Sequence, residues 1–303
     1  MKTLKFGQAA NEWLNIKKDA LRQISYEKYR QVYDAHLVFF NDIEISSIKE
    51  NDIREFMLKK EENEKLSESI LYTIQFVLKA VLEYSRNQYN IDTVVIKKRT
   101  KPKAKSTTPV LTDLQKDMVV KFVFENINSV SVSIILSLFM GLKTGEICAL
   151  TKKNIDFKKN IIYITKTVER VKDSNNSKTN LKIFEVDDKL IKREIPIPKD
   201  IATYINQYIK IYDIKNNYYL ISKTDVISDP RKIQKELNIL CKSLSIKCDF
   251  NILRNTFIHT CLKNNMNIKF LCKILGSQNL KRIYELCPDV DYNLYHSEIE
   301  KSM

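Results

Sequence analysis

One segment divides this sequence into two parts of different character. Residues 97–109 read KKRTKPKAKSTTP, and six of the nine residues from Lys97 to Lys105 are basic. The segment contains two prolines and no large apolar side chain, which is a composition typical of a linker. The sequence therefore predicts two domains, 1–96 and 110–303, joined by a basic linker at 97–109.

Helical periodicity dominates the first part. Apolar residues recur every three or four positions in four stretches, which predicts a module of four helices at 6–21, 25–40, 46–60 and 67–90. We expect Trp13 in the core of this module and Ser25 at the N-cap of its second helix.

The second part combines helices with a few strands. Thr112 and Gln115 have the spacing of a capping box, so we expect a helix from there to about Asn126. Strand-like stretches are confined to the middle, at 160–168, 181–186 and 192–198. Helical patterns precede and follow them, the last from about Leu253. We therefore expect a mainly α fold with a small antiparallel β-sheet.

The composition indicates a polyanionic partner. Lys and Arg number 51 against 37 Asp and Glu, a net charge of +14, and such an excess most often serves nucleic acid. An AT-rich genome also raises the content of Lys, Asn and Ile, but it does not explain the cluster at 97–105. The chain has no secretion signal, no apolar run of about 18 residues and no CxxC pair among its six cysteines. We therefore expect a cytoplasmic protein with reduced core cysteines, no membrane span, no metal and no cofactor.

Four motifs follow one another in the second part: GLKTGEICAL at 141–150, KREIPIP at 192–198, NILRNTF at 251–257 and LCKILGSQNLKRIYEL at 271–286. Together with the helical first part and the basic linker, they resemble the tyrosine recombinase, or phage integrase, family over nearly the whole chain. The resemblance implies a two-domain clamp around double-stranded DNA, with a helical core-binding (SAM-like) domain at 1–96 and a catalytic-type α+β domain at 110–303. It also implies homo-oligomers on paired DNA sites, in which a C-terminal segment is donated to a neighbour.

Members of that family transfer DNA strands without a metal ion. A tyrosine attacks a phosphodiester, two arginines bind the phosphate oxygens, a lysine protonates the leaving oxygen and histidines assist. The resemblance assigns the catalytic positions to Lys143 and Arg254 on the phosphate, Lys189 on the hairpin and Tyr284 as the nucleophile. Lys143 replaces an arginine and lacks its planar fork, whereas Lys189 and Tyr284 match only with a shift of two residues.

Four further family positions carry substitutions. Asn251, Asn255 and Ser277 stand where histidine or another late site residue is expected, and Leu286 stands where the tyrosine is expected. Asparagine can hydrogen-bond a phosphate, but it cannot exchange a proton near neutral pH. The motif around Arg254 therefore resembles a phosphate-binding site without its acid–base chemistry.

We expect DNA contacts from the linker, from the two cations of the site and from the lysines after the first motif. The full set is Lys97, Lys98, Arg99, Lys101, Lys103, Lys105, Lys143, Lys152, Lys153 and Arg254. A basic linker can lie across the backbone of a duplex like a strap. The sequence leaves two alternatives open, a structural ion pair at Arg254 and a solvated hinge at 97–109.

Three functions remain open at this point. The first is a DNA-binding protein of this family, impaired or inactive in strand cleavage, in effect a pseudoenzyme of a mobile genetic element. The second is an active site-specific recombinase that integrates or excises DNA with a shifted tyrosine such as Tyr284. The third is a helical interaction protein without a DNA role, which DNA binding that weakens steeply with salt would contradict.

Overall fold

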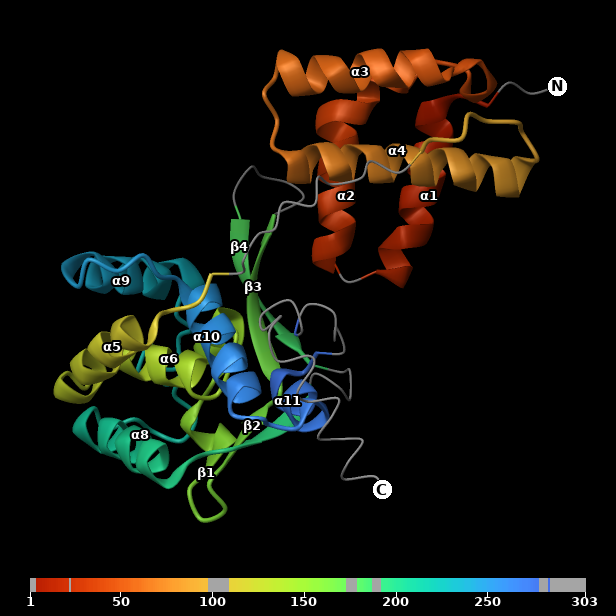
Figure 1. Ribbon diagram of the computed structural model, residues 1–303. Helices are drawn as coiled ribbons and strands as arrows, with labels where there is room; N and C mark the ends of the chain where they lie inside the picture. The colour runs from red at the N-terminus through yellow and green to blue at the C-terminus, as the bar shows by residue number, and fades with distance from the viewer. Residues whose placement is uncertain are drawn as a thin grey trace, which may run out of the picture. The chain divides into compact units, whose positions relative to one another are not determined.

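The computed structural model describes residues 4–21, 23–97, 109–172, 179–186, 192–277 and 283. The described residues form two compact units (Figure 1). The first contains the residues up to Lys97 together with Val171, Lys172 and Thr179, and the second contains the others. None of the helices in these ranges combines the length and the hydropathy that a membrane span needs.

Four helices build the described part of the first unit, as the sequence predicts. They are α1 (Phe6–Ala20), α2 (Gln23–His36), α3 (Glu50–Glu62) and α4 (Glu68–Tyr89), with the 3-10 turns η1 (Leu37–Phe40) and η2 (Ile45–Ser47) (Figure 1). Trp13 is buried, as expected. The prediction of Ser25 as an N-cap is wrong, because α2 begins at Gln23 and Ser25 lies inside its first turn. Gln23 donates to Glu27 at 2.9 Å across that turn, a pairing that supports the helix ahead of Ser25.

Helix α4 shows how this unit is stabilised. Its buried residues recur every three or four positions and form one face, which includes Leu71, Ile74, Val77, Leu78, Val81 and Leu82. That face packs against α1, α2 and α3. Burying each such side chain contributes about 1.5–3 kcal/mol, so the four helices stabilise one another through α4.

The described part of the second unit contains seven helices and a 3-10 turn. They are α5 (Asp113–Glu125), α6 (Ser129–Leu138), α7 (Thr144–Ala149), η3 (Lys152–Asn154), α8 (Lys199–Ile211), α9 (Pro230–Ser243), α10 (Phe250–Lys263) and α11 (Ile268–Leu275). The predicted capping box at the start of α5 is confirmed. The backbone N–H of Thr112 donates to the Gln115 side chain at 3.1 Å, and the N–H of Gln115 donates to Thr112 Oγ1 at 3.2 Å.

Helix α6 lies at the centre of this unit. Every residue from Ser131 to Leu138 is buried, and the helix contacts α5, α7, α8, α9 and α10 (Figure 1). A helix that is buried on all sides, with small serines among its apolar residues, belongs inside a core. It therefore provides a rigid base for α7 and α10, which carry Lys143 at an end and Arg254 in the second turn.

The strands confirm a small antiparallel sheet. β1 (Ile155–Asp156), β2 (Ile161–Ile164) and β5 (Arg193–Pro196) pair antiparallel in the order β1–β2–β5, with Ile162 opposite both Ile155 and Ile195. β3 (Lys166–Lys172) and β4 (Thr179–Glu185) form a separate two-stranded sheet. The stretch 160–168 is thus two strands, because the Thr165 carbonyl accepts from the N–H of Val186 at 2.8 Å instead of continuing the first sheet.

Four of the five described cysteines lie in the core, as the sequence predicts. Cys148, Cys241, Cys248 and Cys261 are buried free thiols, and Cys272 is half-buried. Burial raises the pKa of Cys148 to about 12, which keeps its thiol protonated and unreactive at neutral pH. Cys287 lies outside the described residues.

Candidate functional site

Arg254 lies on α10, where three segments of the second unit meet. The helix begins at Phe250, three residues earlier than the sequence indicates, because Asp249 accepts from the N–H of Ile252 at 2.8 Å as its N-cap. The half-buried Arg254 guanidinium donates to the carbonyl oxygens of Gly141 and Leu275, the second at 2.9 Å. The side chain therefore joins α10 to the turn before α7 and to the end of α11.

Gly141 brings its carbonyl onto Arg254 through a conformation that favours glycine. Its φ is +66°, and a Cβ atom there would lie 2.7 Å from the Phe257 ring and 3.0 Å from Leu275. The first contact is shorter than real Cβ atoms show, and the positive φ would strain any other residue. The glycine of the first motif thus allows the chain to pass closely over α10 and α11.

Lys143 follows two residues after Gly141, at the N-cap of α7, and its side chain is exposed. Its backbone N–H donates to Glu146 Oε2 at 2.9 Å. The backbone is therefore fixed while the ammonium group lies at the surface. This lysine supplies positive charge near Arg254, although it lacks the two parallel donors of an arginine.

A buried ion pair that the sequence analysis missed lies behind these residues. Arg193 of β5 donates from Nη1 and Nη2 to the two carboxylate oxygens of Glu146, at 3.0 and 2.9 Å. The two side chains are only 5% and 2% exposed. Burial alone would raise the pKa of Glu146, but Arg193 and the N–H of Lys143 hold it below its ordinary value. The available signal was weak, because GLKTGE and KREIPIP carry two and three charged residues and nothing in their order marks Glu146 and Arg193 as the buried pair.

Two arginines bind the C-terminal end of α11. Arg193 Nε donates to the Ile274 carbonyl at 2.5 Å, and Arg254 donates to the next carbonyl, that of Leu275. The last carbonyls of a helix lack partners within it and carry the negative end of its dipole. The two cations therefore fix this helix end, after which Gly276 turns the chain at φ +57° and Ser277 follows, half-buried.

The two asparagines at family histidine positions lie in different surroundings. Asn251 is exposed and lies three residues before Arg254, which places both on one face of α10. Asn255 is buried, and its Nδ2 lies 3.5 Å from the Pro109 carbonyl. Asn251 is thus beside Arg254, whereas Asn255 contacts the segment that follows the linker.

The remaining predicted DNA contacts are less closely grouped. The backbone N–H groups of Lys152 and Lys153, on η3, donate to the carbonyls of Tyr218 and Asn216 at 3.2 and 3.0 Å. These two lysines are therefore held by the 216–218 segment and not by the segments that Arg254 joins. Lys97 is exposed in the first unit. Eight predicted site residues lie outside the described residues: Lys98, Arg99, Lys101, Lys103, Lys105, Lys189, Tyr284 and Leu286.

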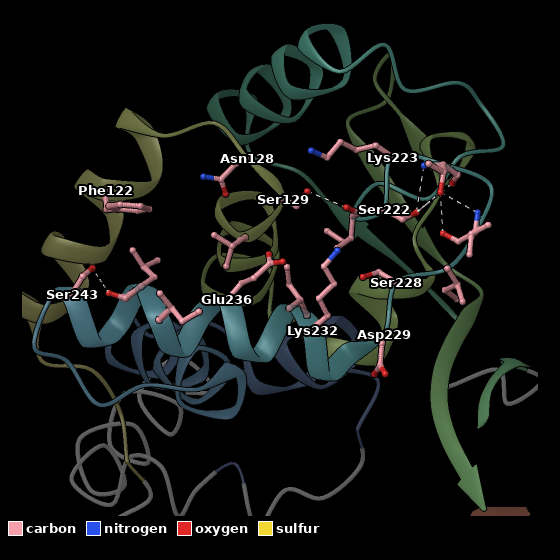
Figure 2. A pocket seen from close by; sticks show the side chains of 18 residues that line it. Phe122, Asn128, Ser129, Ser222, Lys223, Ser228, Asp229, Lys232, Glu236 and Ser243 are labelled. Atoms are coloured by element: carbon pink, nitrogen blue, oxygen red, sulfur yellow. Dashed lines mark hydrogen bonds between the residues drawn. The ribbon is translucent and has the colours of Figure 1, made fainter. Parts of the chain in front are cut away.

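A separate groove of about 840 Å³ lies along α9 (Figure 2). Phe122 of α5, Asn128 before α6 and the 221–229 segment form its other walls. Its lining mixes apolar side chains with Lys223, Lys232 and Glu236, and it includes none of the predicted site residues. In the part of the chain that the structure describes, no group of three or more His, Cys, Asp or Glu is placed to hold a metal ion.

Two family models match the chain. The model of the Phage integrase family matches residues 119–285, which is more than half of the sequence. The model of the phage integrase N-terminal SAM-like domain matches residues 5–60. Among curated proteins the chain has no match.

Solved structures of integrases have a similar fold. The Tn1549 transposon integrase in complex with transposon right end DNA has a TM-score of 0.73 and 17% identity, over 98% of this chain and 99% of that chain. The same integrase with a circular intermediate DNA has a TM-score of 0.74 and 17% identity, with the same coverage. A lambda integrase dimer bound to a COC′ core site has a TM-score of 0.65 and 13% identity, over 95% of this chain and 79% of that chain.

Proposed function

Because the chain belongs to the phage integrase family of tyrosine recombinases, we propose that it binds double-stranded DNA and that its capacity to cleave a DNA strand is impaired or lost. The observation that carries the proposal is the position of Arg254. Its guanidinium is fixed between the Gly141 turn and the end of α11, and the exposed Lys143 follows that turn. The complexes of similar integrases with DNA support the choice of ligand.

The chemistry of the two cations suits a phosphate group. A guanidinium that is already held in place loses little freedom when it binds an anion, and hydrogen bonds between ionised partners are the strong ones. Lys143 adds positive charge, but its ammonium group lacks the parallel N–H donors of a guanidinium. The proposed protein has a core-binding domain at 1–96 and a catalytic-type domain at 110–303. Its DNA-binding surface also includes Lys97, the 97–109 linker, Lys152 and Lys153, and the net charge of +14 favours the same ligand.

Impaired cleavage follows from the residues around Arg254. Lys143 lacks the bidentate fork, and the exposed Asn251 cannot transfer a proton near neutral pH. Asn255 is buried against Pro109 and so offers the phosphate nothing. Losing one preorganised donor from such a site typically costs about 10²–10³ in rate, and several losses in one site leave little activity.

A second candidate, an active recombinase with Tyr284 as nucleophile and Lys189 as acid, has one observation in its favour. Ile283 is 3% exposed and packs in a cluster with Phe257 and Leu275. Phe257 lies three residues after Arg254, and Leu275 provides the carbonyl that Arg254 binds. The residue before Tyr284 therefore lies against the two helices that hold the phosphate site.

DNA binding is tested by fluorescence anisotropy with a 30-bp labelled duplex of arbitrary sequence over a range of salt concentrations. We expect the logarithm of affinity to fall with the logarithm of salt, and Arg254→Gln to reduce that slope by about 0.9, the value for one phosphate. Arg231→Gln, an exposed arginine on α9, removes the same charge as a control. Affinity that is independent of salt would overturn the proposal in favour of an interaction protein.

Strand cleavage is tested with a pool of duplexes that carry a nick and a randomised core, which trap a covalent protein–DNA adduct. The proposal expects no adduct from the wild-type protein under conditions in which it binds the pool. An adduct that Tyr284→Phe abolishes and Tyr292→Phe preserves would instead establish the second candidate. Both tyrosines are present in the sequence, and the exchange removes only the hydroxyl group in each case.

A further inference from the structure

Arg193 binds two segments of the candidate site at once. Its Nη1 and Nη2 hold the carboxylate of Glu146 at 3.0 and 2.9 Å, and its Nε holds the Ile274 carbonyl at 2.5 Å. A guanidinium is planar and rigid, so acceptors on two of its sides are fixed relative to each other. The side chain therefore sets the distance between the start of α7 and the end of α11.

Each end of this connection leads to a proposed phosphate-binding residue. Glu146 Oε2 also accepts the backbone N–H of Lys143 at 2.9 Å, so the carboxylate that Arg193 holds also fixes the backbone of Lys143. Ile274 immediately precedes Leu275, whose carbonyl accepts from Arg254 at 2.9 Å. The positions of Lys143 and Arg254 therefore both depend on Arg193.

Gly276 shows how closely the helix end is packed against this side chain. A Cβ atom on Gly276 would lie 3.0 Å from Arg193 Nη1 and 3.2 Å from its Cδ and Cζ. A side chain at position 276 would therefore crowd the guanidinium, and glycine leaves the space that Arg193 needs beside the end of α11.

Stability alone does not account for this ion pair. Both charged groups lose their hydration on burial, and replacing such a pair with apolar side chains of similar volume is often neutral or stabilising. What the pair provides, and an apolar pair does not, is directional contacts to defined atoms of Glu146 and Ile274.

We propose that Arg193 is a positioning residue of the phosphate site, which holds Lys143 and Arg254 in the relative arrangement that one phosphate group requires. The proposal rests on the proposed function, since it takes DNA phosphate as the ligand. Arg193 is only 8% exposed, so it acts from inside the protein through Glu146 and the end of α11. Neither the basic composition nor the resemblance to the family indicated this role.

The test is a double-mutant cycle on DNA affinity. Arg254→Gln is measured in the wild-type protein and in the Arg193→Met/Glu146→Leu double variant, which removes the ion pair without leaving a buried charge unpaired or changing the net charge. We expect Arg254→Gln to weaken binding of the 30-bp duplex about tenfold in the wild type, the order expected for hydrogen bonds to a charged group. We expect a loss of less than about twofold in the double variant, because a misplaced Arg254 has little binding left to lose.

Two controls separate positioning from general destabilisation. Tyr208→Phe removes a buried hydroxyl that donates to Leu220 at 2.7 Å, away from the site, and in this background Arg254→Gln is expected to keep its tenfold effect. In Arg193→Lys, which keeps the charge and Glu146, hydrogen exchange of the Lys143 amide without DNA is expected to accelerate, because an ammonium group lacks the planar fork that holds both carboxylate oxygens of Glu146. The same exchange in Tyr208→Phe is expected to stay unchanged.

The outcomes distinguish this inference from the proposed function. Equal losses from Arg254→Gln in the wild type and the double variant would overturn the positioning role while leaving phosphate binding intact. Unchanged exchange at Lys143 in Arg193→Lys would also overturn it, whatever the DNA result. If Arg254→Gln had no effect in the wild type, the phosphate contact itself would be refuted, and the positioning role with it.

Discussion

The backbone N–H of Leu111 donates to Thr256 Oγ1 at 2.9 Å, in a buried hydrogen bond between residues 145 positions apart. Thr256 lies two residues after Arg254, so the chain that follows the linker is fastened to the helix that carries Arg254. Thr256→Val removes the acceptor but keeps the shape, and the Leu111 N–H is then buried without its partner. We expect the free energy of unfolding in urea to fall by about 1–3 kcal/mol. Thr203→Val on the exposed face of α8 is the control, and an equal change in both variants would contradict the expectation.

Histidine substitutions distinguish the two asparagines of the third motif, NILRNTF at 251–257. Asn255→His places a larger ring in a buried position against Pro109, and such overpacking typically costs about 1–3 kcal/mol of stability. Asn251→His, on the exposed first turn of α10, is expected to change stability by less than about 0.5 kcal/mol. Chemical denaturation of both variants checks the difference. Equal stability would show that Asn255 does not fill a packed site.

Lys143→Arg tests whether phosphate binding is weaker because position 143 lacks the planar guanidinium of an arginine. A guanidinium at this exposed position supplies two parallel donors in place of a point charge, so we expect binding of the 30-bp duplex to tighten about three- to tenfold. Lys235→Arg, at another exposed lysine, on α9, is expected to leave the affinity unchanged. If both exchanges tighten binding equally, Lys143 makes no specific contact.

The buried carboxylate of Glu146 predicts a pH dependence of stability. Burial acts to raise its pKa, but Arg193 and the Lys143 N–H together lower it below the ordinary value. Because the folded pKa is depressed, its contribution to stability is present above the ordinary value of about 4.3 and is lost as pH falls through the lower folded value. We expect unfolding titrations below about pH 4.3 to show a steeper loss for the wild type than for Arg193→Met/Glu146→Leu. Parallel curves would contradict this.

Local signals in the sequence located most elements. The Thr112–Gln115 capping box works over three residues, so its pattern alone places the start of α5. The start of α2 was missed because Ser25 has the residue type of a cap, although the helix already begins at Gln23, whose side chain donates to Glu27 across the first turn. The division of the 160–168 stretch was missed because it depends on a bond between Thr165 and Val186, which no local pattern reveals.

The site was predictable only in part, for the same reason. The motifs identified Arg254, Lys143 and the substituted position Asn251. The partners of Arg254 are main-chain carbonyls of Gly141 and Leu275, which have no signature in a sequence. The pair of Arg193 and Glu146 joins residues 47 positions apart, and a charge in a motif does not reveal which opposite charge it meets.

Helix α11 has only eight residues, Ile268–Leu275. A segment this short does not form a helix in water by itself, because nucleation outweighs the few bonds it gains. It is helical because Leu271 and Leu275 are buried beneath it and two guanidinium groups from other elements bind its last carbonyls. Shortening the chain from its C-terminal end past this helix would therefore remove acceptors from Arg193 and Arg254 in the interior. A truncation that ends at Lys263 is expected to unfold the rest of the second unit, and not to give a smaller folded form of it.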